Sequence, residues 1–279
     1  MNDQEPGVAR NRRHTWQVAK YLGMFFVWNI GASVALLIGL LLKIELLGLG
    51  LAFLLAVWMV RGYLLGGRGG ARRRALIRPR PLNPLAFRWT LAAIPVLLLA
   101  SWSLTEVWLR LVPVPTASID PFESFTTTIM GKLSISLLAV AIAPVVEEFF
   151  FRGLLQSTLI RQNGPTGGIV ISAAAFAAAH FLPWIFPIHF FLGMALGYAV
   201  WVTRSIWPGV ILHAANNLAA VAGLLQSDKP EAIPTIWQTG LTQQWWLALA
   251  GLALSIVLLT YTARALREAG RLRPLANHP

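Results

Sequence analysis

Long apolar runs that recur through most of the 279 residues are the feature that most constrains this fold. A bilayer core of about 30 Å needs about 20 apolar residues of helix to cross it. Eight runs approach that length: 18–42, 44–60, 89–110, 131–149, 167–183, 187–203, 206–225 and 245–263. Only 12% of the residues are charged, about half the share in soluble domains. We therefore predict an all-α, polytopic membrane bundle of about eight transmembrane helices.

The predicted spans divide the chain into four parts. Residues 1–60 form a basic N-terminal segment and a two-helix hairpin, and residues 61–88 form a cytoplasmic linker rich in Arg, Gly and Pro. We interpret this linker as a flexible basic segment held near acidic lipid. A six-helix bundle, 89–263, and a basic tail, 264–279, complete the chain. The amphipathic stretch 150–162 either lies along the membrane interface or extends the fourth span.

The basic residues predict how the protein is oriented. If the N-terminus is cytoplasmic, 19 of the 23 Lys and Arg residues fall in cytoplasmic segments, as the positive-inside rule requires. This bias predicts that both termini are cytoplasmic and that the number of spans is even. The net charge of +12 does not indicate a nucleic-acid partner, because most basic residues flank apolar runs and face lipid headgroups. The arginine-rich composition with short loops favours the inner membrane of a bacterium.

Two adjacent carboxylates, Glu147 and Glu148, end the apolar run that begins near residue 131. An ionisable side chain within a membrane is by default a candidate functional residue, because burying its charge is costly. Arg152 lies one turn after Glu148, so we predict that these two side chains form an ion pair with a structural role. Neighbours on an α-helix point about 100° apart, so Glu147 is expected to face a polar cavity instead. A desolvated carboxylate there can act as a general base toward water.

Two polar pairs lie in later apolar runs at the i, i+4 spacing that shares one helix face: Phe176 with His180, and His213 with Asn217. His213 and Asn217 can offer N–H donors to a developing oxyanion. The alternative for both pairs is helix packing, since His and Asn also form hydrogen bonds between membrane helices. Helical rise places Glu147 near the cytoplasmic end of its span and His180 deeper. Tilted or broken helices, or a later start of the fifth span, must then bring them together.

A metal site is a second possibility for the same residues. Glu147, His180 and His213 would make a two-His, one-carboxylate set that suits zinc, although no HExxH spacing is present. We favour no cofactor, and zinc remains the alternative. The absence of cysteine excludes disulfides, thiolate metal sites and a cysteine nucleophile. The remaining histidines are expected to be structural or exposed, with His189 at a span end the one of most interest.

Three motifs carry a resemblance to a known family. Glu147-Glu148-x-x-x-Arg152-Gly, Phe176-x-x-x-His180 and His213-x-x-x-Asn217 resemble the motifs of the CAAX protease and bacteriocin-processing (CPBP, or Abi) family, which includes type II CAAX prenyl endopeptidases. The resemblance covers about residues 130–225.

The resemblance implies an intramembrane endopeptidase of the glutamate type. By position, Glu147 would activate water with help from His180, and His213 and Asn217 would stabilise the oxyanion. Glu148, Arg152 and Phe176 would support them. The implied substrate is a lipidated or hydrophobic membrane peptide. The alternatives are a non-proteolytic scaffold or bacteriocin-immunity protein, and an ion-coupled transporter, which would require inverted repeats that the sequence does not show. The sequence does not indicate an oligomeric state.

Overall fold

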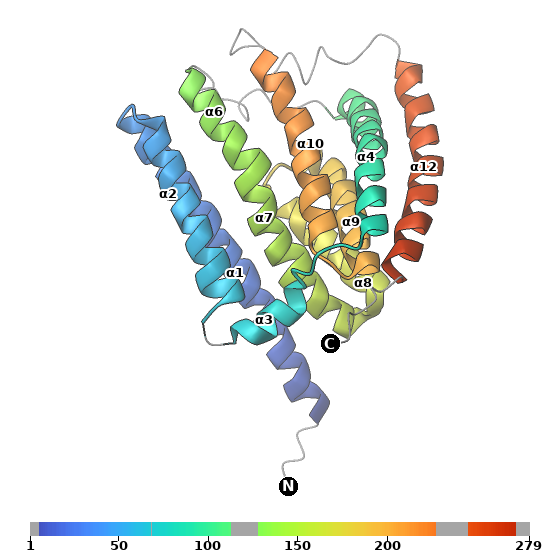
Figure 1. Ribbon diagram of the computed structural model, residues 1–279, viewed down its shortest axis with the longest axis horizontal. Coiled ribbons are helices and arrows are strands. Elements are labelled where there is room, and N and C mark those ends of the chain that lie inside the picture. The colour runs from blue at the N-terminus through green and yellow to red at the C-terminus, as the bar shows by residue number, and fades with distance from the viewer. Residues whose placement is uncertain (1–5, 68, 113–127, 227–244, 272–279) are drawn as a thin grey trace.

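The computed structural model describes residues 6–67, 69–112, 128–226 and 245–271. This part of the chain consists of helices joined by turns, without a strand, and confirms the predicted all-α membrane bundle (Figure 1). Six of the described helical segments are long and apolar enough to cross a membrane. One of them, Ile129–Ala178, turns back at Gly164, so it supplies two legs of the bundle.

The N-terminal hairpin consists of α1 (Pro6–Leu41) and α2 (Glu45–Val57), and α2 continues as the π-helix η1 (Trp58–Leu65). The two helices cross closely, since a Cβ added at Gly39 would lie 2.7 Å from the backbone nitrogen of Gly48. The short helix α3 (Gly70–Ile77) follows. The segment interpreted as a flexible linker therefore includes a helix, and the carbonyl of Leu76 in that helix accepts a bond from the hydroxyl of Ser157 at 3.1 Å.

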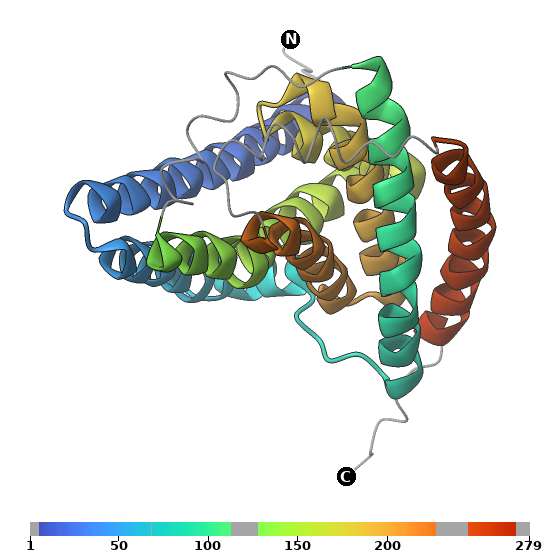
Figure 2. The ribbon, with the colours of Figure 1, turned by 90° about the horizontal axis from the view of Figure 1, so that it is seen from above.

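Helices α4 (Pro84–Leu111) and α12 (Trp245–Arg271) pack along each other at the side of the bundle away from the hairpin (Figure 2). Helix α4 starts at a proline in its first turn, after the Asn83 side chain, which accepts a bond from the Ala86 amide at 2.7 Å. This is a favourable start for a helix, because the cap satisfies one of the free amides and proline needs none. The beginning of α1 and the end of α12 lie at the same end of the bundle (Figure 1).

The central helical run changes type along its length. It consists of α6 (Ile129–Leu137), π-helix η3 (Leu138–Ile142), α7 (Ala143–Glu148), π-helix η4 (Phe149–Gln156) and α8 (Ser157–Ala178). The stretch 150–162 thus extends the fourth span rather than lying along the interface. π-Helical segments inside membrane and soluble helices are often found at functional sites.

The turn at Gly164 resolves the depth mismatch between the predicted site residues. Gly164 has φ 71° and ψ 175°, a conformation that favours glycine, and Pro165 follows it. Glu147 lies 17 residues before this turn and His180 lies 16 residues after it. Since the two legs run antiparallel from Gly164, both residues sit at a similar depth. The fourth span continues well past residue 149, which is where the sequence analysis ended it.

Two further helices complete the described bundle. After the short 3-10 helix η5 (Pro183–Ile185), α9 (Phe186–Thr203) packs on α8, and α10 (Trp207–Gln226) packs on α9, α4 and the central run. A Cβ added at Gly193 would lie 3.0 Å from the Ala173 Cα, so α8 and α9 are in close backbone contact. Small residues at such crossings are typical of membrane helix packing.

Candidate active site

The helix α7 ends on the two carboxylates, both of which are buried: Glu147 is 9% exposed and Glu148 is 0% exposed. Because they lie between two π-helical segments, the regular 100° step of an α-helix does not extend far on either side of them. Both side chains face His213 on α10, and they approach different nitrogens of its ring. Glu148 therefore faces His213 in addition to forming its predicted pair with Arg152.

Glu148 forms the predicted ion pair and also a bond that the sequence did not predict. Its Oε1 forms an ion pair with Arg152 Nη1 at 2.9 Å and accepts a hydrogen bond from His213 Nδ1 at 3.1 Å. A carboxylate oxygen only accepts, so Nδ1 carries the hydrogen and Nε2 is free to act as a base or to take up a proton. A Cβ at Gly209 would overlap Oε2 of Glu148, so glycine at this position lets the carboxylate approach α10. Glu148 thus orients the His213 ring.

Glu147 has a different environment. Its Oε2 lies 3.8 Å from His213 Nε2 and, like Oε2 of Glu148, is buried without a hydrogen-bond partner among the described residues, but no described arginine forms an ion pair with Glu147. A buried carboxylate oxygen that lacks a partner is costly, and in a native structure it calls for a ligand or water. The Nε2 of His213 and the unpaired oxygen of Glu147 therefore face each other between α10 and α7.

Phe176 is the residue on which the rest of the site packs. Its ring is fully buried, and its centroid lies 4.8 Å from that of His180 and 5.5 Å from that of His213. The guanidinium carbon of Arg152 lies 4.2 Å from the ring centroid, within range of a cation–π interaction. The Phe176 ring therefore holds three groups in place: the Arg152 guanidinium, which pairs with Glu148, and the imidazoles of His180 and His213.

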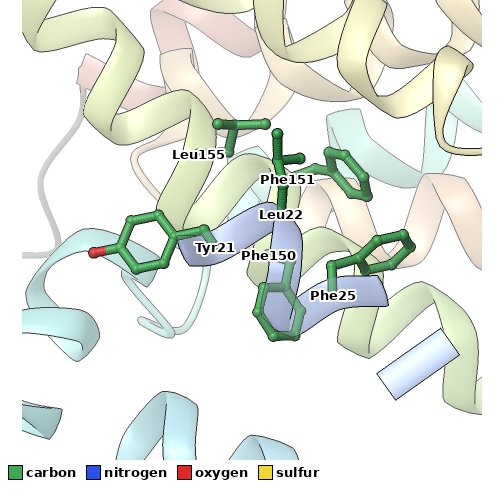
Figure 3. Close-up of a pocket in the computed structure, with 6 residues that line it drawn as sticks. All are labelled: Tyr21, Leu22, Phe25, Phe150, Phe151 and Leu155. Carbon is green, nitrogen blue, oxygen red and sulfur yellow. The ribbon is translucent and has the colours of Figure 1, made fainter. Parts of the chain in front are cut away.

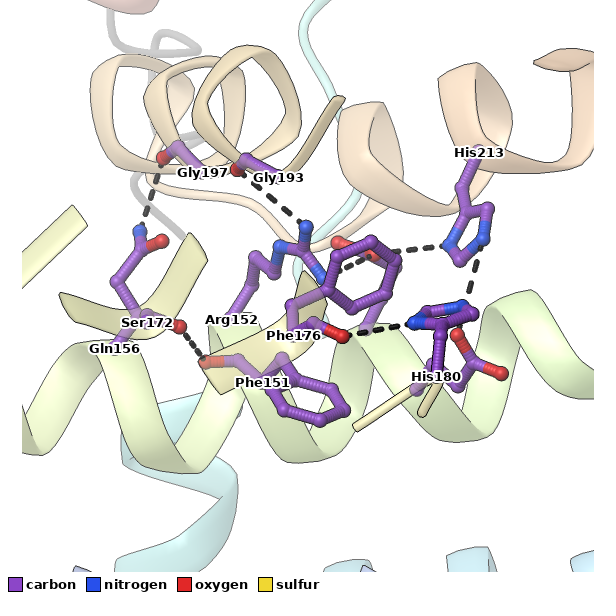
Figure 4. Close-up of polar contacts among 11 residues, drawn as sticks. Phe151, Arg152, Gln156, Ser172, Phe176, His180, Gly193, Gly197 and His213 are labelled. Atoms are coloured by element: carbon purple, nitrogen blue, oxygen red, sulfur yellow. Dashed lines mark hydrogen bonds and ion pairs between the residues drawn. The ribbon is translucent and has the colours of Figure 1, made fainter. Parts of the chain in front are cut away.

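His180 lies at the end of the helical run, one turn after Phe176. Its Nδ1 bonds with the carbonyl of Phe176 at 2.8 Å, which makes Nδ1 the donor and leaves Nε2 as an acceptor. The rings of His180 and His213 both pack against that of Phe176 (Figure 4). Glu147 and Glu148 thus contact His213, and Phe176 contacts both His213 and His180.

Asn217 lies one turn after His213 on α10, but its side chain contacts a different part of the central run. Its Nδ2 donates to the carbonyl of Ala139, in the π-helix η3, at 2.9 Å. One of its two amide hydrogens thus ties α10 to the central run, and the other is uncommitted.

Two residues that the sequence analysis did not assign to the site lie in it or beside it. The ring of His189, on α9, has its centroid 4.0 Å from that of His180. Gln156, one turn after Arg152, is 2% exposed and donates to the carbonyl of Gly197 at 2.9 Å. The i, i+4 spacing of Arg152 and Gln156 is a sequence signal that could have placed Gln156 beside the site. The contact of His189 depends on how α9 lies against α8, which no local spacing reveals.

Within the part of the chain that the structure describes, no three His, Asp or Glu side chains are grouped so as to hold a metal ion. Three imidazoles and two carboxylates lie in or beside the site, but Glu148 is committed to Arg152 and His213.

An apolar groove lies next to the site, between α1 and η4 (Figure 3). It is lined by Tyr21, Leu22, Phe25, Phe150, Phe151 and Leu155. Phe151 packs edge-on against Phe25, with ring centroids 4.8 Å apart, and against Phe176, with centroids 5.3 Å apart. The N-terminal hairpin is therefore part of the wall around the site.

Comparison with known proteins identifies the central part of the chain. Residues 129–219, 91 of the 279 residues, match the family described as type II CAAX prenyl endopeptidase Rce1-like. This match confirms the family predicted from the three motifs, and all seven motif residues fall within it. Searches of curated proteins and of solved structures found no match. In the chain, the matched segment follows the hairpin α1–α2 and α4 and precedes α12.

Proposed function

We propose that this protein is an intramembrane endopeptidase in which Glu147 activates a water molecule. The observation that carries the proposal is the unpaired, buried Oε2 of Glu147, placed 3.8 Å from His213 Nε2 inside a CAAX-protease domain. A buried carboxylate next to an imidazole suits general base catalysis on water.

The proposed reaction proceeds in two steps. Glu147 takes a proton from water while the oxygen attacks the peptide carbonyl carbon, and His180 helps to orient the water through its free Nε2. The tetrahedral oxyanion is stabilised by the imidazole of His213, held by Glu148, and by the second amide hydrogen of Asn217. The carbonyl then re-forms, the C–N bond breaks, and the amine leaves with the proton from Glu147. Oxyanion donors of this kind typically contribute about 3–4 kcal/mol each.

The substrate we propose is a lipidated or hydrophobic membrane peptide. A site within a membrane bundle meets such a chain without extracting it from lipid. We place the protein in the cytoplasmic membrane of a bacterium with both termini cytoplasmic, as the distribution of arginines favours.

The proposal is tested by incubating the purified protein with membrane peptides in detergent and identifying products by mass spectrometry. We expect two fragments whose masses sum to that of the substrate plus one water. A strong chelator should leave the rate unchanged if Glu147 and His180 activate the water. Loss of activity that added Zn²⁺ restores would instead support the zinc alternative. A folded protein that cleaves none of a broad set of peptides would support the scaffold alternative.

A further inference from the structure

The C-terminal ends of α3 and α9 lie next to each other, and each is followed by an arginine. Arg78 follows α3 and Arg204 follows α9, and both have left-handed backbone conformations, with φ 54° and φ 53°. Backbone contacts join the two segments: the Ile206 amide donates to the Arg78 carbonyl at 3.2 Å, and the Ser205 hydroxyl donates to the Arg80 carbonyl at 2.6 Å. The positions of these arginines are therefore fixed by the fold.

A third segment brings another arginine to the same place. The Gly153 position packs against Ile77, where a Cβ would lie 2.8 Å from the Ile77 Cγ1, and Ser157 bonds the carbonyl of Leu76. Arg161, one turn beyond Ser157 and just before the turn at Gly164, is exposed at this end of the bundle. Arg78, Arg161 and Arg204 thus converge from α3, α8 and the end of α9. We call these three residues the arginine cluster.

The charges of the arginine cluster are not neutralised within the described residues. No described carboxylate pairs with any of its three members. Burial lowers the pKa of the half-buried Arg78, and the positive charges of Arg204, Arg161 and Arg80 lower it further. The negative ends of the α3 and α9 dipoles offset only part of this repulsion.

Two neighbouring arginines on α3 show the contrast. Arg73 donates to the carbonyls of Tyr63 and Gly66 at 2.6 and 2.8 Å, and Arg74 donates to the carbonyl of Leu65. These side chains satisfy the free carbonyls at the end of η1, which is a structural role. The members of the arginine cluster make no such bonds within the described residues, so their guanidinium groups are free to bind a ligand.

The place of the cluster indicates which anion it meets. Arg204 directly follows the span Pro183–Thr203, and Arg78 lies between the spans Glu45–Leu65 and Pro84–Leu111. Trp207, which is exposed, lies three residues after Arg204, and tryptophan is enriched at the level of the headgroups. The cluster therefore lies where lipid phosphates lie, on the side that the charge distribution predicts to be cytoplasmic.

We propose that Arg78, Arg161 and Arg204 form a binding site for the phosphate headgroup of an anionic phospholipid. Guanidinium groups suit this ligand because their planar forks bind phosphate oxygens in pairs. The bound lipid would neutralise the cluster and hold α3 against the CAAX-protease domain. This site does not depend on the proposed peptidase activity.

The test measures lipid binding to the full chain in mixed micelles by native mass spectrometry. The ligands are phosphatidylglycerol, phosphatidylcholine and inorganic phosphate. The variant is the triple substitution Arg78→Gln, Arg161→Gln and Arg204→Gln. Its matched control replaces three exposed arginines that make no described contact, Arg72→Gln, Arg88→Gln and Arg264→Gln, so that both proteins lose the same charge.

Near a membrane surface one basic residue contributes about a fivefold change in affinity, so the cluster as a whole contributes on the order of a hundredfold. We expect the triple variant to lose the preference for phosphatidylglycerol over phosphatidylcholine and the control to keep it. Equal losses in both proteins would overturn the site in favour of diffuse charge. Binding of inorganic phosphate at the cluster without any lipid preference would overturn the assignment to a headgroup. If the triple variant does not fold, Arg161→Gln alone, at an exposed position, should still give the single-residue loss, and its absence would overturn the proposal.

Discussion

Glu147 and Glu148 are neighbours in the chain, yet the same substitution should lower the stability of the protein strongly at Glu148 and only slightly at Glu147. Glu148 is fully buried, forms an ion pair with Arg152 at 2.9 Å and accepts a hydrogen bond from His213 at 3.1 Å. Glu148→Gln leaves the guanidinium of Arg152, itself 1% exposed, without its ion pair. Removing one partner of a buried pair costs about 3–5 kcal/mol, because the remaining charge stays buried.

Glu147→Gln should not have this cost. The Glu147 carboxylate has an oxygen without a hydrogen-bond partner among the described residues, and no arginine pairs with it. An amide is less costly to bury than a charge, so we expect the free energy of unfolding to change by less than about 1 kcal/mol.

Thermal unfolding of both variants in one detergent, followed by circular dichroism, measures the difference. For a chain of this size 1 kcal/mol corresponds to about 2–4 °C in Tm, so Glu148→Gln should lower Tm by roughly 6–20 °C. Glu147→Gln should lower it by less than about 4 °C. Equal decreases for the two variants, or an unchanged Tm for Glu148→Gln, would refute the different roles of the two carboxylates.

Two further substitutions test the contacts around these residues. Gly209→Ala places a methyl group against the carboxylate of Glu148 and should lower the free energy of unfolding by about 1–3 kcal/mol. The control Gly50→Ala, where the added methyl group meets open space, should leave Tm unchanged. Similar Tm values for the two variants would contradict the close approach of Glu148 to Gly209. His189→Ala removes the ring that packs 4.0 Å from His180 and should lower the cleavage rate by up to about 10²-fold, while His189→Phe keeps the packing and most of the rate. An equally inactive Phe variant would show that the imidazole of His189 itself is needed.

The fold class followed from the sequence because lipid leaves few options. Apolar runs of helical length could be counted, and the spacing of Glu148 and Arg152 gave their ion pair correctly. The place where the fourth span ends was missed, although Gly164 and Pro165 are a turn signal, because the residues before them read equally well as an interfacial helix.

The arrangement around His213 could not be predicted from spacing alone. Helix periodicity says where a side chain points, but not that one ring presents two nitrogens to two adjacent carboxylates. The π-helical segments on both sides of α7 have no sequence signal of their own. The contact of His189 with His180 likewise depends on the packing of α9 on α8.

The rate of peptide cleavage by Glu147→Gln, compared with the wild type, tests the central claim most directly. Glu268→Gln, an exposed carboxylate on α12, is the matched control. We predict that Glu147→Gln folds normally and loses about 10²- to 10⁴-fold in rate, as expected for removal of a general base, while the control cleaves as the wild type does. A folded Glu147→Gln protein that cleaves at the wild-type rate would contradict the account.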